Sequence, residues 1–226
     1  MRIMSKILAL AIIMALGAWF FLARNSSKNV VVAPPIANQS QNQNQIKLDS
    51  QIGNVQVVSE FQSPLDRAGE RVTKKPFGKF VTPQNSPVQP EKFYGYHTGA
   101  DFEIFPEELN ADVSIHALCS GKIEVKKTAT GYGGVVVENC TLNGQPITVV
   151  YGHLKLASVK WAIGDDLKTG DVIGSLGAAY SAETGGERKH LHLGFHKGTV
   201  INILGYVQNK AELSGWIDPC LFVCNN

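Results

Sequence analysis

The sequence contains little charge, and its positive and negative residues nearly cancel. Charged residues make up 18% of the 226 residues, and the formal net charge is +2. There is no basic stripe, helix-turn-helix, zinc finger or interleaving of aromatic and basic residues, so we expect no nucleic-acid partner. The length is sufficient for one substantial domain and a tail.

Helical periodicity is also missing from most of the chain. Between Tyr94 and Phe195 no stretch repeats its apolar residues with the period of an amphipathic helix. Short apolar or alternating runs are instead separated by turn residues, as at Asn143-Gly144. This pattern predicts a mainly β domain built on an antiparallel sheet. The expected strands are 122–125, 135–138, 147–151 and 190–195.

One long apolar run lies near the N-terminus. Ile7–Ala23 has no charged residue and is flanked by basic residues on both sides. As a helix it would be roughly 26 Å long, enough to cross a bilayer core. Bulky residues at 19–21 stand where a cleaved signal peptide needs small ones. We therefore predict a transmembrane signal anchor over 1–24, with a cleaved signal peptide as the alternative.

The next stretch is polar and then gives way to a domain. Residues 25–64 are rich in Asn, Gln and Ser, with too little apolar surface to offset the entropy of ordering, which predicts a flexible linker. From 65 the texture changes to short apolar runs with turns, so we predict one domain over 65–226. The whole arrangement predicts a protein of the cell envelope, anchored in the membrane with its domain outside the cytoplasm.

Four cysteines bear on the compartment. An even number on a chain with an export signal favours disulfides, most simply Cys119 with Cys140 and Cys220 with Cys224, although three pairings are possible. The alternative is a structural zinc site. The spacings lack the two Cys-x-x-Cys knuckles that such sites usually have.

Four of the six histidines fall in three short motifs. In the first, His97 and Asp101 lie four residues apart, and Gly99 between them permits a tight backbone path along which both side chains can turn toward one ion. The second motif places His153 directly after a predicted strand. Each of these patterns alone is common in sites without any metal.

The third motif is His190-Leu191-His192, on a predicted strand. Successive side chains of a strand point to opposite faces, so the two imidazoles share one face about 6–7 Å apart. Leu191 and Leu193 then face the core. Two histidines on one rigid element can ligate a metal, or one can ligate while the other transfers protons.

Taken together and in this order, the motifs resemble the lysostaphin-like zinc endopeptidases of bacterial cell walls. The resemblance covers about Pro76 to Pro219 and includes Ile163-Gly164-Asp165 and 168–174. It implies a lysostaphin-like, duplicated-hybrid-like metallopeptidase domain. It also implies hydrolysis of an amide bond in the peptide stems or cross-links of peptidoglycan, for wall remodelling.

The same resemblance assigns roles to five residues. His97, Asp101 and His192 would bind a tetrahedral Zn²⁺ and leave one position open for water or the scissile carbonyl, the arrangement of catalytic zinc sites. His153 and His190 match the catalytic histidines, and the sequence leaves open which one is the general base. No His-Glu-x-x-His motif supplies a glutamate base instead.

The remaining basic and histidine residues near these motifs need separate interpretation. His116 and His196 are expected to lie outside the site. The stretch 178–189 is longer and more charged than in many relatives, and it should wall the substrate groove. Arg188 and Lys189 can pair with a carboxylate of the stem peptide, or they are solvated loop charges.

Three alternatives remain open from sequence. A non-catalytic relative would bind wall peptides, or activate another hydrolase, while still holding zinc. A secreted lytic enzyme would act on other cells, and a third possibility is a peptidase for peptides outside the wall. We predict no particular oligomeric state.

Overall fold

A computed structural model of the protein describes residues 61–225. This part of the chain consists mostly of β-strands, with two α-helices of four residues each and four short 3₁₀ helices, labelled η. The elements are α1 (Ala68–Arg71), β1 (Phe80–Val81), β2 (Gly95–His97), β3 (Gly99–Glu103), η1 (Pro106–Glu108), β4 (Ser114–His116), β5 (Gly121–Ala129), β6 (Gly133–Leu142), β7 (Gln145–Gly152), η2 (Leu156–Ser158), β8 (Asp166–Leu167), β9 (Val172–Ser175), η3 (Ala182–Thr184), β10 (His190–Lys197), β11 (Tyr206–Val207), η4 (Lys210–Gly215), β12 (Trp216–Ile217) and α2 (Cys220–Val223).

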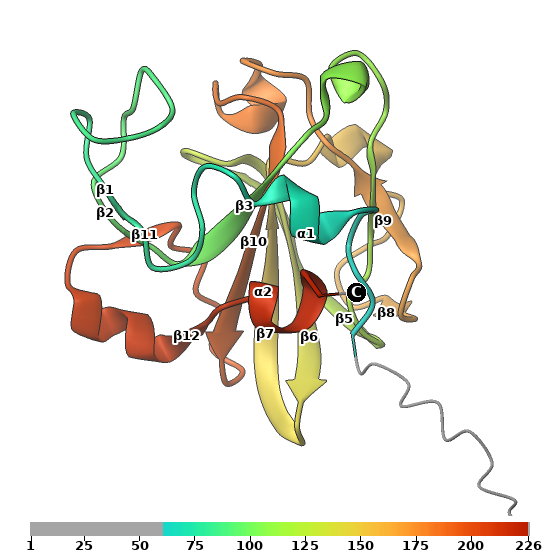
Figure 1. Ribbon diagram of the computed structural model, residues 1–226. Helices are drawn as coiled ribbons and strands as arrows, with labels where there is room; N and C mark the ends of the chain where they lie inside the picture. The colour runs from blue at the N-terminus through green and yellow to red at the C-terminus, as the bar shows by residue number, and fades with distance from the viewer. Residues whose placement is uncertain (1–60, 226) are drawn as a thin grey trace, which may run out of the picture. The chain divides into compact units, whose positions relative to one another are not determined.

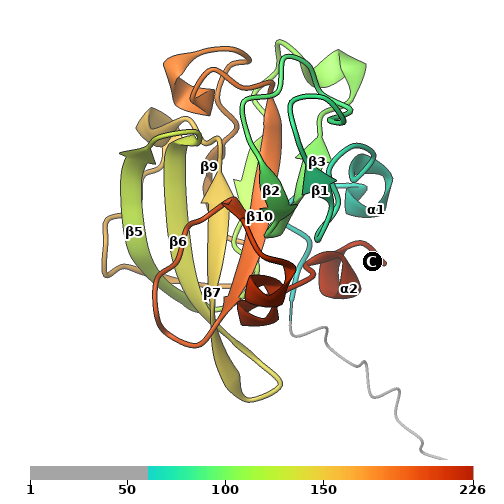
Figure 2. The same ribbon diagram turned by 90° about the vertical axis from the view of Figure 1, so that its left-hand side faces the viewer.

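Seven strands form the largest sheet (Figure 1, Figure 2). Their order is β12-β10-β7-β6-β5-β8, and β3 pairs with β10 beside this path. All of its pairings are antiparallel. The four predicted strands lie within β5, β6, β7 and β10, so the predicted mainly antiparallel β fold is confirmed.

Two smaller sheets complete the described part of the chain. One contains β1, β2 and β11, and the other contains β4 and β9. In the first of them β11 pairs with β2, and Tyr206 lies directly opposite His97. This pairing brings the C-terminal part of the chain next to the first histidine motif.

The hydrophobic core lies on one face of the large sheet. Leu191, Leu193 and Phe195 alternate along β10, and all three are fully buried in the main apolar cluster, as the strand period predicted. The helices α1 and α2 cover this face (Figure 1). The histidines of β10 therefore point to the opposite face.

Both disulfides have the expected partners. Cys119 is bonded to Cys140 and Cys220 to Cys224, and the described residues contain no free cysteine. The first bridge joins the segment before β5 to β6, and the second closes α2. The structural zinc site considered as an alternative is therefore not formed by these cysteines.

Phe61, the first described residue, is packed in the core of the domain. The anchor expected over 1–24 and most of the linker expected over 25–64 lie outside the described residues, but Phe61 does not. Its side chain is 2% exposed, and its ring centroid lies 5.7 Å from that of Phe195 and 6.0 Å from that of Phe222. One aromatic residue after a polar stretch produces no periodic signal, so the sequence does not show that packing extends to Phe61, before the predicted boundary at 65. Within residues 61–225, no helix has the length and apolar character that a membrane crossing requires.

Replacing Phe61 by Ala tests this boundary. We expect the free energy of unfolding to fall by about 3 kcal/mol, because the change removes a buried ring and leaves a cavity against Phe195. Urea denaturation of the purified domain measures it. The exposed neighbour Asp66 provides the control, since Asp66→Ala should change stability by less than about 0.5 kcal/mol. Equal stability of Phe61→Ala and the parent would place the start of the domain later.

A carboxyl group, that of Glu138 on β6, is also buried next to the core residue Tyr151. The side chain of Glu138 is fully buried, and its Oε2 accepts a hydrogen bond of 2.6 Å from the Tyr151 hydroxyl. Its Oε1 has no partner among residues 61–225. Burial raises the pKa of Glu138 from 4.5 to about 7.

This carboxyl predicts a pH dependence of stability. Between pH 4.5 and about 7 the folded chain retains on Glu138 a proton that the unfolded chain has lost, so the contribution of Glu138 to stability falls as pH rises through this window and levels off above it. The Glu138 contribution amounts to about 3 kcal/mol. Urea denaturation from pH 4 to 8 should show the stability of the parent falling by this amount relative to that of Glu138→Gln, in which the other titratable groups are unchanged. Parallel curves for the two proteins would contradict it.

Candidate metal centre and catalytic cleft

The register of β10 with its neighbours positions the site. His192 lies directly opposite Asp101 on β3, and also opposite Gly152 on β7. Directly paired residues of antiparallel strands have their side chains on the same face. Asp101 and His192 therefore share a face, and His190, two residues along β10, shares it as well. His97 ends β2 only two residues before β3 begins.

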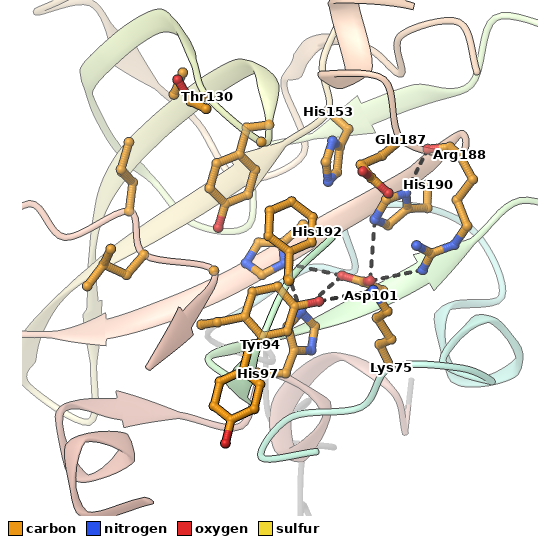
Figure 3. A pocket seen from close by; sticks show the side chains of 18 of the residues that line it. Lys75, Tyr94, His97, Asp101, Thr130, His153, Glu187, Arg188, His190 and His192 are labelled. Atoms are coloured by element: carbon orange, nitrogen blue, oxygen red, sulfur yellow. Dashed lines mark hydrogen bonds and ion pairs between the residues drawn. The ribbon is translucent and has the colours of Figure 1, made fainter. Parts of the chain in front are cut away.

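Three side-chain atoms from these elements meet in a small triangle (Figure 3). His97 Nε2 lies 3.1 Å from His192 Nδ1, and Asp101 Oδ1 lies 3.2 Å from each of these nitrogens. In a tetrahedron around Zn²⁺ with bonds of about 2.0–2.1 Å, the ligands lie about 3.3–3.4 Å apart. The triangle therefore has the donor types and almost the dimensions that a tetrahedral zinc site requires. The fourth coordination position would have no protein ligand.

The electrostatics of the triangle suit a cation. Burial alone would raise the pKa of Asp101, but the neighbouring His97 and His190 outweigh it and hold this pKa well below its usual range. Burial lowers the pKa of His192 to about 4. At neutral pH Asp101 is thus a carboxylate and His192 a neutral imidazole, the forms of these side chains that bind a metal.

Two of the three candidate ligands are oriented by neighbours outside the triangle. His97 Nδ1 donates a hydrogen bond to the carbonyl of Pro76 at 3.3 Å, which leaves Nε2 with a free lone pair. The outer oxygen of Asp101, Oδ2, accepts one from Arg188 at 2.9 Å. His192 differs, because its buried Nε2 has no partner within residues 61–225.

The two remaining histidines lie side by side next to the triangle. The ring centroids of His153 and His190 are 4.2 Å apart. His153 Nδ1 donates to the carbonyl of Thr184 at 3.0 Å, and His190 Nδ1 donates to the carbonyl of Arg188 at 2.8 Å. In both rings the backbone thus holds the Nδ1 proton, and Nε2 is the atom left for chemistry. All five residues predicted for the site are brought together here.

The surroundings of the two catalytic candidates differ. Burial, reinforced by the charge of His190, lowers the pKa of His153 well below its usual range. The backbone of His153 is left-handed, with φ of 66°, a conformation that is uncommon outside glycine and often marks functional sites. His190 Nε2 lies 3.3 Å from Asp101 Oδ2, so a proton placed on this nitrogen faces a carboxylate.

Gly99 serves the site in a way that the sequence did not reveal. We expected it to permit a tight backbone path between His97 and Asp101, but it lies in β3 and its φ is not left-handed. A Cβ atom at this position would lie 2.3 Å from the carbonyl oxygen of Leu193 and 2.9 Å from Nε2 of His192. Glycine is therefore required because β10 and its histidine approach so closely.

Arg188 is a functional residue whose role the sequence analysis missed. It is neither a solvated loop charge nor free for a substrate carboxylate, because its side chain is 9% exposed and already paired. Its guanidinium donates to Asp101 Oδ2 at 2.9 Å and to both carboxylate oxygens of Glu103. The strand period could have indicated only that Asp101 and Glu103, two residues apart, share one face of β3. The structure adds that Glu103 lies opposite His190 on β10.

Lys189 is likewise occupied. It is 5% exposed, and its ammonium donates to three backbone carbonyls in the segment 108–111. Both cationic residues before His190 are therefore paired within the protein. In this structure neither side chain is free for a carboxylate of the stem peptide, and neither is a solvated loop charge.

A cleft with a volume of about 430 Å³ opens over these residues. Besides the five site residues, its lining includes the aromatic side chains of Phe93, Tyr94, Tyr132 and Tyr206. Tyr132 is 8% exposed, and its hydroxyl has no partner among the described residues. The other two histidines lie outside this lining, as expected: His116 Nδ1 donates to the carbonyl of Gly170, and the ring of His196 packs against Trp216.

Comparison with known proteins agrees with this site. Residues 95–203, which contain all five site residues, match the model of peptidase family M23. No curated protein matches the sequence. Among solved structures, that of LytU is 26% identical, covering 67% of this chain and 83% of that one, with a TM-score of 0.45. The catalytic domain of the antimicrobial peptidase lysostaphin from Staphylococcus simulans is 21% identical, covering 69% of this chain and 94% of that one, with a TM-score of 0.46. The match over residues 95–203 shows a domain of peptidase family M23, in agreement with the predicted resemblance to the lysostaphin-like endopeptidases.

Proposed function

We propose that this protein is a zinc-dependent endopeptidase that hydrolyses an amide bond in the peptide stems or cross-links of bacterial peptidoglycan. The match to a peptidase family supports the reaction class. The observation that carries the proposal is a triangle of two nitrogens and one oxygen with two further imidazoles beside it, all lining one cleft. A purely structural zinc site would require a fourth protein donor. Among the described residues none joins the triangle.

His97, Asp101 and His192 would hold a zinc ion, which would supply Lewis-acid chemistry by lowering the pKa of water toward neutrality and polarising the scissile carbonyl. The protein then has to move protons. His153 is the better acceptor, because its lowered pKa keeps Nε2 unprotonated at neutral pH. His190 is the better donor, because an imidazolium there lies 3.3 Å from Asp101 Oδ2. We assign His153 as general base, and His190 as the donor to the oxyanion and to the leaving amine.

We also propose that the domain works in the cell envelope, outside the cytoplasm, and is held there by the anchor expected over 1–24. The two disulfides support an oxidising compartment. N-terminal sequencing of the protein recovered from membranes tests this, since an uncleaved anchor begins at Met1. A shortened protein in the soluble envelope fraction would favour the secreted form.

The decisive experiment for the reaction is digestion of purified peptidoglycan, with the released fragments identified by mass spectrometry. We expect each cut to produce one new amine and one new carboxyl end within the peptide part of the wall. Removal of the metal by a chelator should abolish the cuts, and added Zn²⁺ should restore them. An absence of new ends, or cleavage that resists chelation, would contradict the proposal.

A further inference from the structure

Most of the charged side chains that line the cleft are already paired within the protein. Four charged side chains line it besides the histidines, and three of these are compensated by buried partners. Lys75 Nζ lies 2.5 Å from the buried carboxylate of Glu91. Asp101 and Arg188 are paired with each other, and Arg188 also pairs with Glu103. None of these three is free to recognise a charged substrate group.

Glu187 is the fourth, and its situation is different. Its side chain is 9% exposed, whereas that of its ion-pair partner Lys92 is 55% exposed, at a distance of 3.3 Å. An ion pair with a largely hydrated partner contributes little to stability, so Lys92 is easily replaced by another cation. Figure 3 shows Glu187 on the same side of the cleft as His153 and His190.

The backbone around Lys92 is held by hydrogen bonds, whereas its side chain is largely exposed. Glu91 Oε1 accepts hydrogen bonds from the backbone N–H groups of Lys92 at 3.0 Å and Phe93 at 2.9 Å. Glu91 itself is held by Lys75 and by the hydroxyl of Ser86. The ammonium of Lys92 can therefore leave Glu187 without any rearrangement of the cleft wall.

We propose that Glu187 binds a cationic amine of the substrate, and that Lys92 occupies this position until the substrate replaces it. The inference rests on the proposed function and adds the charge of the substrate: the preferred wall peptide carries a free ammonium group near the scissile bond. The substrate group recognised by Glu187 is thus positively charged, whereas the sequence suggested that Arg188 or Lys189 recognises a negatively charged carboxylate. The side chains of Arg188 and Lys189 form hydrogen bonds within the protein instead.

Purified peptidoglycan in two forms tests the proposal. One sample is untreated, and in the other the free amines are acetylated with acetic anhydride, which removes their charge. The parent protein should cleave untreated wall about tenfold faster or more, because one charged hydrogen bond is lost on acetylation. Glu187→Gln, which keeps the shape of the side chain, should cleave both walls at similar rates. Lys92→Met should keep or increase the preference, since it leaves Glu187 free.

Binding gives a second measurement that needs no turnover. In a His190→Ala background, co-sedimentation with untreated wall should exceed that with acetylated wall, and adding Glu187→Gln should remove the difference. A parent without preference, or a Glu187→Gln variant that loses equally on both walls, would overturn the inference while the proposed reaction stands. If neither wall is cut, the proposed reaction fails, and the binding comparison still decides the role of Glu187. Thermal unfolding of Glu187→Gln checks that the variant is folded.

Discussion

Replacing His190 by Ala should lower kcat by about 10²–10⁴-fold while the metal content of the protein stays unchanged. His190 lies beside the triangle of candidate ligands and is not part of it, and its Nε2 faces the cleft with Nδ1 fixed by the carbonyl of Arg188. The change therefore removes a proton donor and leaves the three metal donors in place. Rates on purified peptidoglycan, with metal analysis of the same samples, measure both quantities.

His196 provides the matched control. It lies on β10 with the same strand parity as His190, but it packs against Trp216 away from the cleft. His196→Ala should keep activity within a few-fold of the parent. If His190→Ala retained full turnover, the assignment of His190 as proton donor would be wrong. If the parent itself produced no cuts, the non-catalytic alternative, a wall-binding or hydrolase-activating module, would become the better account of this domain.

Replacing Arg188 by Ala should weaken zinc binding by about 10–100-fold, the usual cost of removing a group that orients a metal ligand. The side chain holds Asp101 Oδ2 at 2.9 Å, so that Oδ1 faces the two imidazoles. It also compensates Glu103, and breaking a buried ion pair costs about 3–5 kcal/mol of stability. Competition with a chelating dye measures the affinity, and urea denaturation measures the stability.

Arg188→Lys separates charge from geometry. Lysine keeps the positive charge but cannot contact Asp101 and Glu103 at the same time through a planar fork, so its zinc affinity should fall between those of the parent and Arg188→Ala. Unchanged zinc affinity in Arg188→Ala would show that Asp101 is oriented without help. Because affinity is read without substrate, this result does not depend on the identity of the bond that is cut.

The strand that carries the site could be predicted well from sequence. The alternation in His190-Leu191-His192-Leu193 indicated which side chains face the core, and the structure confirms it. The five site residues came from three motifs recognised together, none of which is specific alone. The order of the motifs in the chain, rather than any periodicity, made the prediction possible.

Contacts between distant segments could not be predicted in this way. Arg188 and Asp101 are 87 residues apart, and only the register of β3 with β10 brings them together. The same register explains Gly99, whose missing side chain makes room for the neighbouring strand. Phe61 was missed because its partners, Phe195 and Phe222, lie more than a hundred residues later. Local patterns contain no information about such pairings.

The central place of β10 links catalysis to heat resistance. This strand pairs with β3 and β7 along its first half, and with β7 and β12 along its second half. Elements bonded on both edges and packed on an apolar face open only in global unfolding. On heating, loss of turnover and loss of secondary structure should therefore coincide at a single midpoint, with no inactive but folded state between them.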